Sequence, residues 1–217
     1  VSAEGNGGLV NPNSVAHVYR LQDDGRWLPE AVLREPGDFS SRNFGTNVAI
    51  RDDTVLVGGF IRRPNEEPRG AVLVYHRNAQ NEWSYATTLL ADDDDVYIGF
   101  GDATVLGDGF AVIGSGNVRD QFEEPGNGYV FERLPDNTWV RRGRLFSPDI
   151  DGSWSFGKSI AVRGRQAVFG APGRGPVEAP NRGRAYLFDL WQPICHQDGS
   201  CFCRPGFAGD LCADAAP

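Results

Sequence analysis

The sequence predicts an all-β chain built from repeated sheets of four antiparallel strands, and three observations predict it. Marker residues recur every 56 positions, apolar and polar residues alternate with a period of two between the markers, and glycine and proline are frequent. The 28 glycines and 14 prolines make up 42 of 217 residues, about 19%, against an average usage of roughly 12%. This excess favours short strands joined by tight turns.

Four independent sets of residues carry the repeat. They are Trp27, Trp83 and Trp139; Phe44-Gly45, Phe100-Gly101 and Phe156-Gly157; Tyr19, Tyr75 and Phe131; and Leu33, Leu89 and Leu145. Because every set keeps the same spacing of 56 residues, the repeat is real. We expect the recurring phenylalanines to fill the space between adjacent sheets and the glycines to permit close backbone approach.

Within one period the pattern predicts four strands in order. Residues 44–50 form the first, and a tight turn at 51–53 leads into the second at 54–57. A polar loop with two prolines precedes the third strand at 70–76, and a fourth strand rich in β-branched and aromatic residues follows at 82–90. Four antiparallel strands in a unit of about 40–56 residues are typical of a β-propeller blade. No segment has a convincing helical pattern.

The phase of the repeat predicts how many blades the chain holds. Val1 aligns with Val57, at the end of a second strand. We therefore expect strands three and four of one blade, two full blades and strands one to three of another, over residues 1–191. Three to three and a half blades form an incomplete ring. The chain lacks Met, so we expect a processed form, an excised domain or part of a longer chain. The incomplete ring predicts either that upstream sequence is missing or that a partner chain, or self-association, completes the ring through the open blade edges.

These repeats resemble the FG-GAP repeat, the blade unit of the integrin α-subunit head and of many secreted bacterial surface proteins. The third copy is the most similar, with Phe156-Gly157-Lys158-Ser159-Ile160-Ala161-Val162 followed by Gly170-Ala171-Pro172. The earlier copies depart at Gly58-Gly59-Phe60 and Gly114-Ser115-Gly116. The resemblance implies an adhesion or ligand-binding scaffold, since only a minority of the family form part of enzymes. Integrin-type calcium loops are not expected, because the connections at 51–53, 107–109 and 163–165 are too short for six to eight oxygen ligands.

The tail at 192–217 resembles the C-terminal part of an EGF-like module. Its four cysteines are Cys195, Cys201, Cys203 and Cys212. The resemblance implies a disulfide between Cys203 and Cys212, which leaves Cys195 to pair with Cys201 if both bridges form. Such staples imply an oxidising compartment, so we expect a secreted, periplasmic or cell-surface protein. A zinc site that includes His196 is the rival interpretation.

Charge and motifs exclude several function classes. The net charge of −8 argues against nucleic acid as a partner. No run of about 18 apolar residues is present, so no membrane span is expected. His17 and His76 lack an obvious nucleophile or metal partner in the sequence, and no hydrolase, zinc-protease or P-loop motif occurs. We predict no catalytic residues, no enzyme activity and no resident cofactor.

The resemblance places a ligand rim on the loops that join strands four to one and two to three. In this sequence those loops are 34–43, 91–99 and 147–155, with 59–69, 115–127 and 171–182. The candidate rim residues are charged: Asp92, Asp93, Asp94, Asp95, Asp149 and Asp151, with Arg62, Arg63, Arg119 and Arg174. The acidic run is interpreted as a solvated loop, with a weak Ca²⁺ or cationic-ligand site as the alternative.

The sequence therefore predicts an extracellular adhesion or scaffold protein that acts by protein–protein contact through propeller loops and an EGF-like tail, within a larger or oligomeric assembly. A carbohydrate-binding propeller is the first alternative, and a glycan is then the partner. A fragment of a secreted enzyme, catalytic or non-catalytic, is the second. Because fold does not determine function, the distinction needs an experiment.

Overall fold

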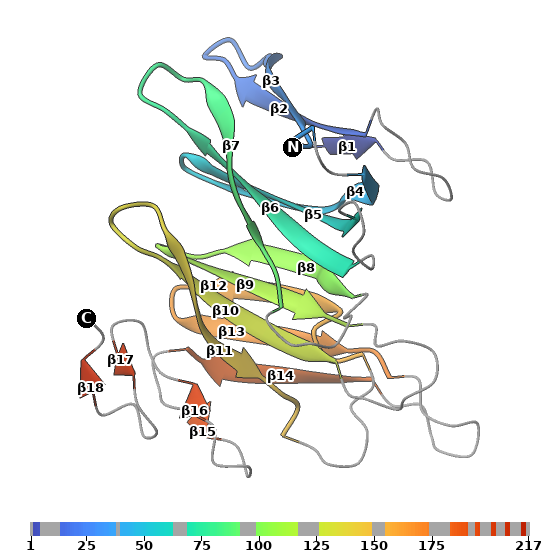
Figure 1. Cartoon of the computed structure of the whole chain (residues 1–217), viewed down its shortest axis with the longest axis vertical. Helices are drawn as coiled ribbons and strands as arrows, with labels where there is room; N and C mark the ends of the chain where they lie inside the picture. Colours follow the sequence, from blue (N-terminus) through green and yellow to red (C-terminus); the bar gives the residue numbers. More distant parts are fainter. Residues whose placement is uncertain are drawn as a thin grey trace. The chain divides into compact units, whose positions relative to one another are not determined.

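All the elements that the structure describes are β-strands (Figure 1). The structure, a computed structural model, describes residues 2–4, 14–37, 40–62, 69–91, 99–116, 126–148, 155–173 and 183–190, with the short strands at 194–195, 201–202, 207–208 and 214–215. The chain forms two compact units, Val1–Thr104 and Val105–Pro217, and each is described by itself. The predicted boundary between 191 and 192 remains a prediction.

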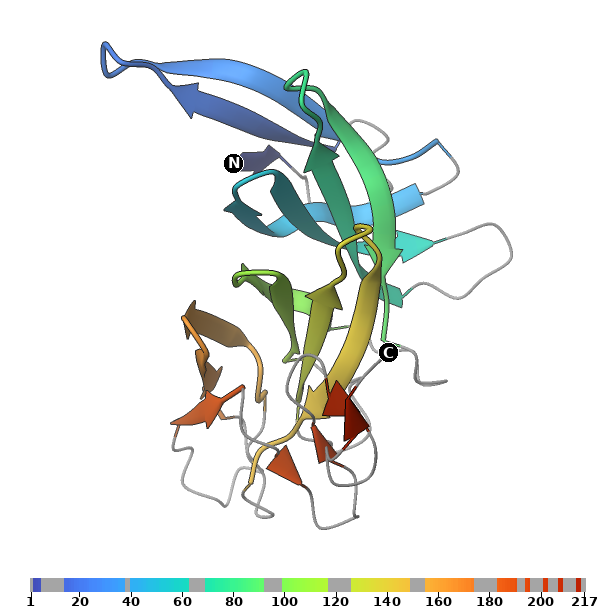
Figure 2. The ribbon, with the colours of Figure 1, turned by 90° about the vertical axis from the view of Figure 1, so that its left-hand side faces the viewer.

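The first unit contains two antiparallel sheets. One has the order β1 (Ser2–Glu4), β2 (Val15–Leu21), β3 (Trp27–Arg34). The other has the order β4 (Ser40–Arg51), β5 (Thr54–Arg62), β6 (Arg69–Arg77), β7 (Trp83–Leu89). In Figure 2 the β2–β3 and β6–β7 hairpins appear as long curved ribbons, blue and green. Each strand pairs with its neighbour in sequence, as a blade requires.

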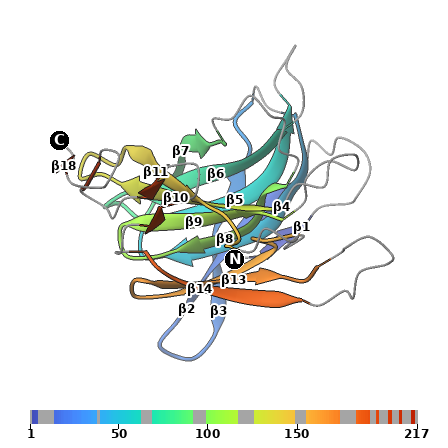
Figure 3. The same ribbon diagram turned by 90° about the horizontal axis from the view of Figure 1, so that it is seen from below.

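The later strands repeat this arrangement. A four-stranded sheet has the order β8 (Phe100–Leu106), β9 (Phe110–Ser115), β10 (Asn127–Arg133), β11 (Trp139–Leu145). A three-stranded sheet follows with β12 (Ser159–Arg163), β13 (Gln166–Ala171) and β14 (Arg184–Asp189), and its last two strands run side by side in Figure 3. Two short pairs lie in the tail, β15 (Ile194–Cys195) with β16 (Cys201–Phe202), and β17 (Phe207–Ala208) with β18 (Asp214–Ala215).

The predicted strand order is confirmed, and two strands are longer than expected. The first strand of the second sheet begins at Ser40 rather than at residue 44, and the second strand continues to Arg62 rather than ending at residue 57. Pairing resumes beyond an irregularity, since Arg42 lies opposite Phe60 while Asn47 lies opposite Gly58. The sequence did not predict this extension, because the residues between these pairs interrupt the alternation. Arg62 therefore ends a strand instead of lying within a loop.

The Phe-Gly pairs have the structural role that was expected of them. Phe44, Phe100 and Phe156 are all buried. The glycine that follows each has a positive φ, at 89° for Gly45, 93° for Gly101 and 86° for Gly157. Other residues adopt this left-handed region only at a cost of about 1–2 kcal/mol. The glycine therefore permits a backbone turn that directs the preceding phenylalanine into the core.

A second set of glycines brings neighbouring sheets into close backbone contact. A Cβ on Gly58 would lie 2.7 Å from the carbonyl oxygen of Gly101, and a Cβ on Gly114 would overlap that of Gly157. In return, a Cβ on Gly101 would approach the carbonyl oxygen of Ala71 to 3.0 Å. The contact recurs once in each unit at the 56-residue spacing, so the repeat specifies backbone-to-backbone packing.

Each unit buries a core between its sheets. In the first unit, Ala16, Val18 and Leu33 of the β1–β3 sheet pack with a group from the next sheet: Phe44, Val55, Val57, Ala71, Leu73 and Tyr75. In the second unit, residues of β9–β11 pack with Phe156, Ala167, Phe169 and Ala171. The cores therefore lie between blade-like sheets, which is how twisted sheets bury their apolar faces.

Candidate functional site

Within each sheet that the structure describes, the connections that the sequence assigned to the rim leave at one edge. Because adjacent strands are antiparallel, the end of strand two, the start of strand three, the end of strand four and the start of strand one lie at the same edge of a sheet. The opposite edge holds tight turns, such as the one between Arg51 and Thr54. The topology thus brings the predicted rim connections of one sheet to the same edge of that sheet.

The predicted site residues themselves lie outside the described side chains. This holds for Asp92, Asp93, Asp94, Asp95, Asp149, Asp151, Arg63, Arg119 and Arg174, and for Cys203 and Cys212. Arg62, Cys195 and Cys201 are described only as strand backbone, in β5, β15 and β16. The rim and the disulfides therefore remain predictions.

The two histidines with described side chains lie in strands. His76 places its Nδ1 3.1 Å from the hydroxyl of Thr54, and the His17 ring lies 6.2 Å from the Tyr19 ring. Among the described residues, no three His, Cys, Asp or Glu side chains gather as metal ligands. His76 thus makes a contact between β6 and β5, and His17 makes one within β2.

A buried polar pair in the second unit lies at the base of a rim loop. Ser115 ends β9, Asn127 begins β10, and the two are directly opposite each other. Both are buried, and within the described part of the chain neither the Ser115 hydroxyl nor either polar atom of the Asn127 amide has a hydrogen-bond partner. Directly opposed residues point to the same face of a sheet, so the two side chains share one environment.

The backbone around this pair is tightly packed. A Cβ on Gly126 would lie 2.6 Å from the Ser115 carbonyl oxygen, and one on Gly116 would lie 2.7 Å from the Cα of Lys158. An unsatisfied buried polar group costs about 1–3 kcal/mol. A hydroxyl and an amide together offer donors and acceptors, which suit an ordered water molecule or a small polar group.

The sequence contained a signal for this pair that its motifs did not reveal. At the position of Ser115 the other copies have Gly59 and Ala171, and at the position of Asn127 the preceding copy has Ala71. Polar residues therefore replace the small apolar residues of the preceding copy at both positions. A comparison of the copies position by position identifies both residues.

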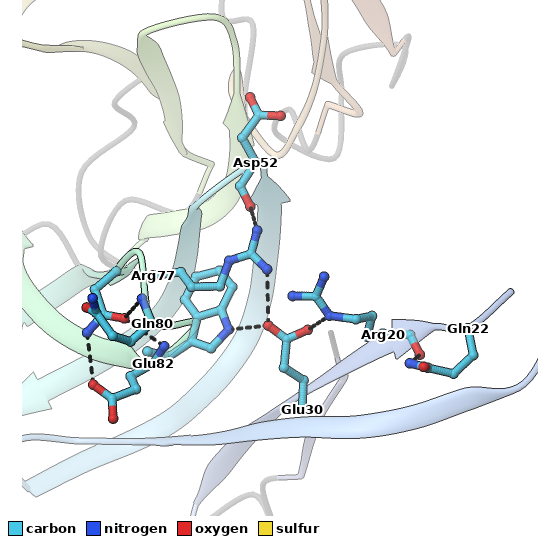
Figure 4. A network of polar contacts seen from close by, with 9 residues as sticks. Arg20, Gln22, Glu30, Asp52, Arg77, Gln80 and Glu82 are labelled. Atoms are coloured by element: carbon cyan, nitrogen blue, oxygen red, sulfur yellow. Dashed lines mark hydrogen bonds and ion pairs between the residues drawn. The ribbon is translucent and has the colours of Figure 1, made fainter.

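A polar network in the first unit joins its two sheets at the turn edge (Figure 4). Glu30, on a bulge of β3, accepts a hydrogen bond of 2.7 Å from Arg20 Nε of β2. Its other oxygen accepts one of 2.8 Å from the indole N–H of Trp83 and lies 3.4 Å from Arg77 Nη1. Arg77 also stacks 5.5 Å above the Trp83 ring.

The electrostatics of this network favour a charged Glu30. The hydrogen bond from Arg20 holds the pKa of the Glu30 carboxyl below its ordinary value, and the hydrogen bond from Trp83 acts in the same direction, although burial opposes both. Sequence reasoning missed Glu30 because the equivalent positions in the next two copies hold Ala86 and Arg142. The network connects the β1–β3 sheet to the β4–β7 sheet, at the end of the sheets opposite to the predicted rim loops.

The comparison with known families gives one result. An FG-GAP repeat is found at residues 139–188. These bounds run from the start of β11 through β12 and β13 nearly to the end of β14, so the match spans strand four of one sheet and strands one to three of the next. No curated protein sequence matches the chain.

The FG-GAP match supports the predicted general class of protein. FG-GAP repeats are typical of extracellular protein-interaction domains, and the all-β structure with antiparallel sheets is consistent with the FG-GAP β-propeller class. In the part of the chain that the structure describes, no helix is long and apolar enough to cross a membrane.

Proposed function

We propose that this chain is an extracellular adhesion or scaffold protein that binds other proteins through the loops at the rim edge of its sheets. The observation that carries the proposal is the FG-GAP repeat at 139–188, which coincides with strands β11–β14. Within each sheet the 2–3 and 4–1 connections leave at the same edge, which supports a binding role for these loops.

The proposal includes a stapled tail and no resident cofactor. Disulfides between Cys203 and Cys212 and between Cys195 and Cys201 would order residues 192–217, which are too few to bury a core of their own. Reducing agent should then unfold the tail and leave most of the β signal in far-ultraviolet circular dichroism. Complete loss of that signal would contradict a separate module.

The binding experiment uses purified extracellular proteins, a glycan array and a hydrolase panel in parallel. We expect saturable binding to a protein that is lost when Asp92, Asp93, Asp94 and Asp95 are all changed to Asn, or when Arg119 and Arg174 are changed to Gln. Asp23→Asn and Asp108→Asn, in exposed turns at the opposite edge, are the matched controls and should bind normally. Repeating the binding with added Ca²⁺ or with chelator tests the acidic run as a cation site.

The outcomes separate the function classes. Binding to glycans alone would replace the proposal with a lectin, and turnover on the hydrolase panel would replace it with an enzyme. Binding that the turn-edge controls abolish as strongly as the rim variants would contradict the rim.

A further inference from the structure

The β1–β3 sheet exposes an apolar face. Ala16, Val18 and Leu33 point into the core of the first unit, and the side chains that alternate with them point the other way. On that second face Tyr19 is 41% exposed, Leu21 53% and Trp27 65%. Large apolar side chains grouped on one face of a sheet mark a docking surface.

The repeat shows what covers a face of this kind. Tyr75 is the equivalent of Tyr19 one period later, and it is only 2% exposed. It packs in the core with Ala16, Val18 and Leu33 of the preceding sheet. The cover of this face is therefore a β-sheet that presents small and branched apolar side chains.

The β12–β14 sheet exposes a face of the complementary kind. Val168 and Leu187 lie directly opposite each other and are 41% and 66% exposed. Their equivalents, Val112 and Val130, are paired in the same way and are almost completely buried. Those equivalents pack against Ala167 and Phe169 of the following sheet and against Phe156, which precedes its first strand.

We infer that this chain associates head to tail with a second copy, the Val168–Leu187 face of one copy packing on the Tyr19–Trp27 face of the other. The two exposed faces are the two sides of the sheet-to-sheet interface that the repeat forms within each unit. The inference deepens the proposed function, because it names one partner of the scaffold and the surface that binds it. A head-to-tail contact leaves one face of each type free, so further copies can add.

Native mass over a range of concentrations tests the inference, using the 217-residue chain. We expect a concentration-dependent oligomer that added NaCl does not dissociate, because the two faces are apolar and salt screens the repulsion between copies that each have a net charge of −8. Trp27→Asp and Leu187→Asp should each weaken it about tenfold or more. Leu28→Asp is the matched control, since Leu28 is exposed on the other side of the same hairpin.

Mixing the two variants gives the decisive result. Trp27→Asp keeps one intact face and Leu187→Asp keeps the other, so an equimolar mixture should form a one-to-one dimer and stop there. Both side chains are more than half exposed, so both variants should fold, and circular dichroism is the check. A monomer at all concentrations, unchanged association in both variants, or a mixture that stays monomeric would overturn the inference. Partner binding by the Trp27→Asp variant tests the proposed function independently.

Discussion

The cores of the two units have different side chains at equivalent positions of the repeat. In the first unit Ala16 of one sheet shares the core with Val57 of the next. In the second unit the equivalent positions are Gly128 and Phe169, and a Cβ on Gly128 would overlap the Phe169 ring. A larger residue on one sheet is thus matched by a smaller one on the other, which keeps the packed volume nearly constant.

The aromatic side chains of the second core also pack in a defined way. Phe156 stacks on Phe169 with ring centroids 4.9 Å apart, and Phe188 meets Phe169 edge to face at 5.4 Å. In the first core Phe44 packs with aliphatic residues and Tyr75, and Tyr75 donates a hydrogen bond to the Arg34 carbonyl. The comparison teaches that the repeat preserves backbone geometry and volume while the side chains vary.

The largest expected effect comes from the backbone contact that both units share. Gly157→Ala should lower the free energy of unfolding by about 3 kcal/mol or more, because φ is 86° and the new Cβ would strike the Asn127 carbonyl. Gly164→Ala has a similar φ of 56° with open space around it and should cost only about 1–2 kcal/mol. Urea unfolding measures both. Equal losses would show that the close approach is unimportant.

The matching of a small residue on one sheet to a large residue on the next predicts the second-largest loss of stability. Gly128→Ala should cost about 1–3 kcal/mol by overpacking. Adding Phe169→Leu should restore part of the loss, so the double variant is more stable than the two single losses predict. In the first unit the position equivalent to Gly128 is Ala16, and Ala16→Gly makes the reverse change there. Strict additivity in the double variant would contradict the matched volumes.

The Glu30 network of the first unit predicts a pH-dependent effect. Glu30→Gln should cost about 1–2 kcal/mol at pH 7, since it weakens the hydrogen bonds to Arg20, Arg77 and Trp83. Because the folded-state pKa of Glu30 is lowered, its contribution is complete above the ordinary value of 4.5 and is lost as the pH falls through the folded-state pKa. Unfolding measured from pH 7 to pH 3 should show the two proteins converging. A constant difference would contradict a stabilising charge.

The smallest effect is expected at the buried polar pair of the second unit. Changing Ser115 and Asn127 together to Ala, the residue found at 171 and 71, should lower the free energy of unfolding by no more than about 1 kcal/mol. The reason is that no described group pairs with either side chain. A loss above about 2 kcal/mol would instead reveal a bound water molecule or ligand, which a high-resolution crystal structure would locate.

The sequence by itself determined the period, the order of the strands and the role of the Phe-Gly pairs. These features depend on local alternation and on residues that recur at a fixed distance, so they can be predicted from the sequence. Only the tertiary structure decided that β4 and β5 pair beyond their irregularity, that Glu30 joins two sheets and that Ser115 and Asn127 are buried together. Those outcomes depend on which residues meet across neighbouring strands and sheets. The same physical reason explains why Tyr19 is exposed while Tyr75, with the same place in the repeat, is buried.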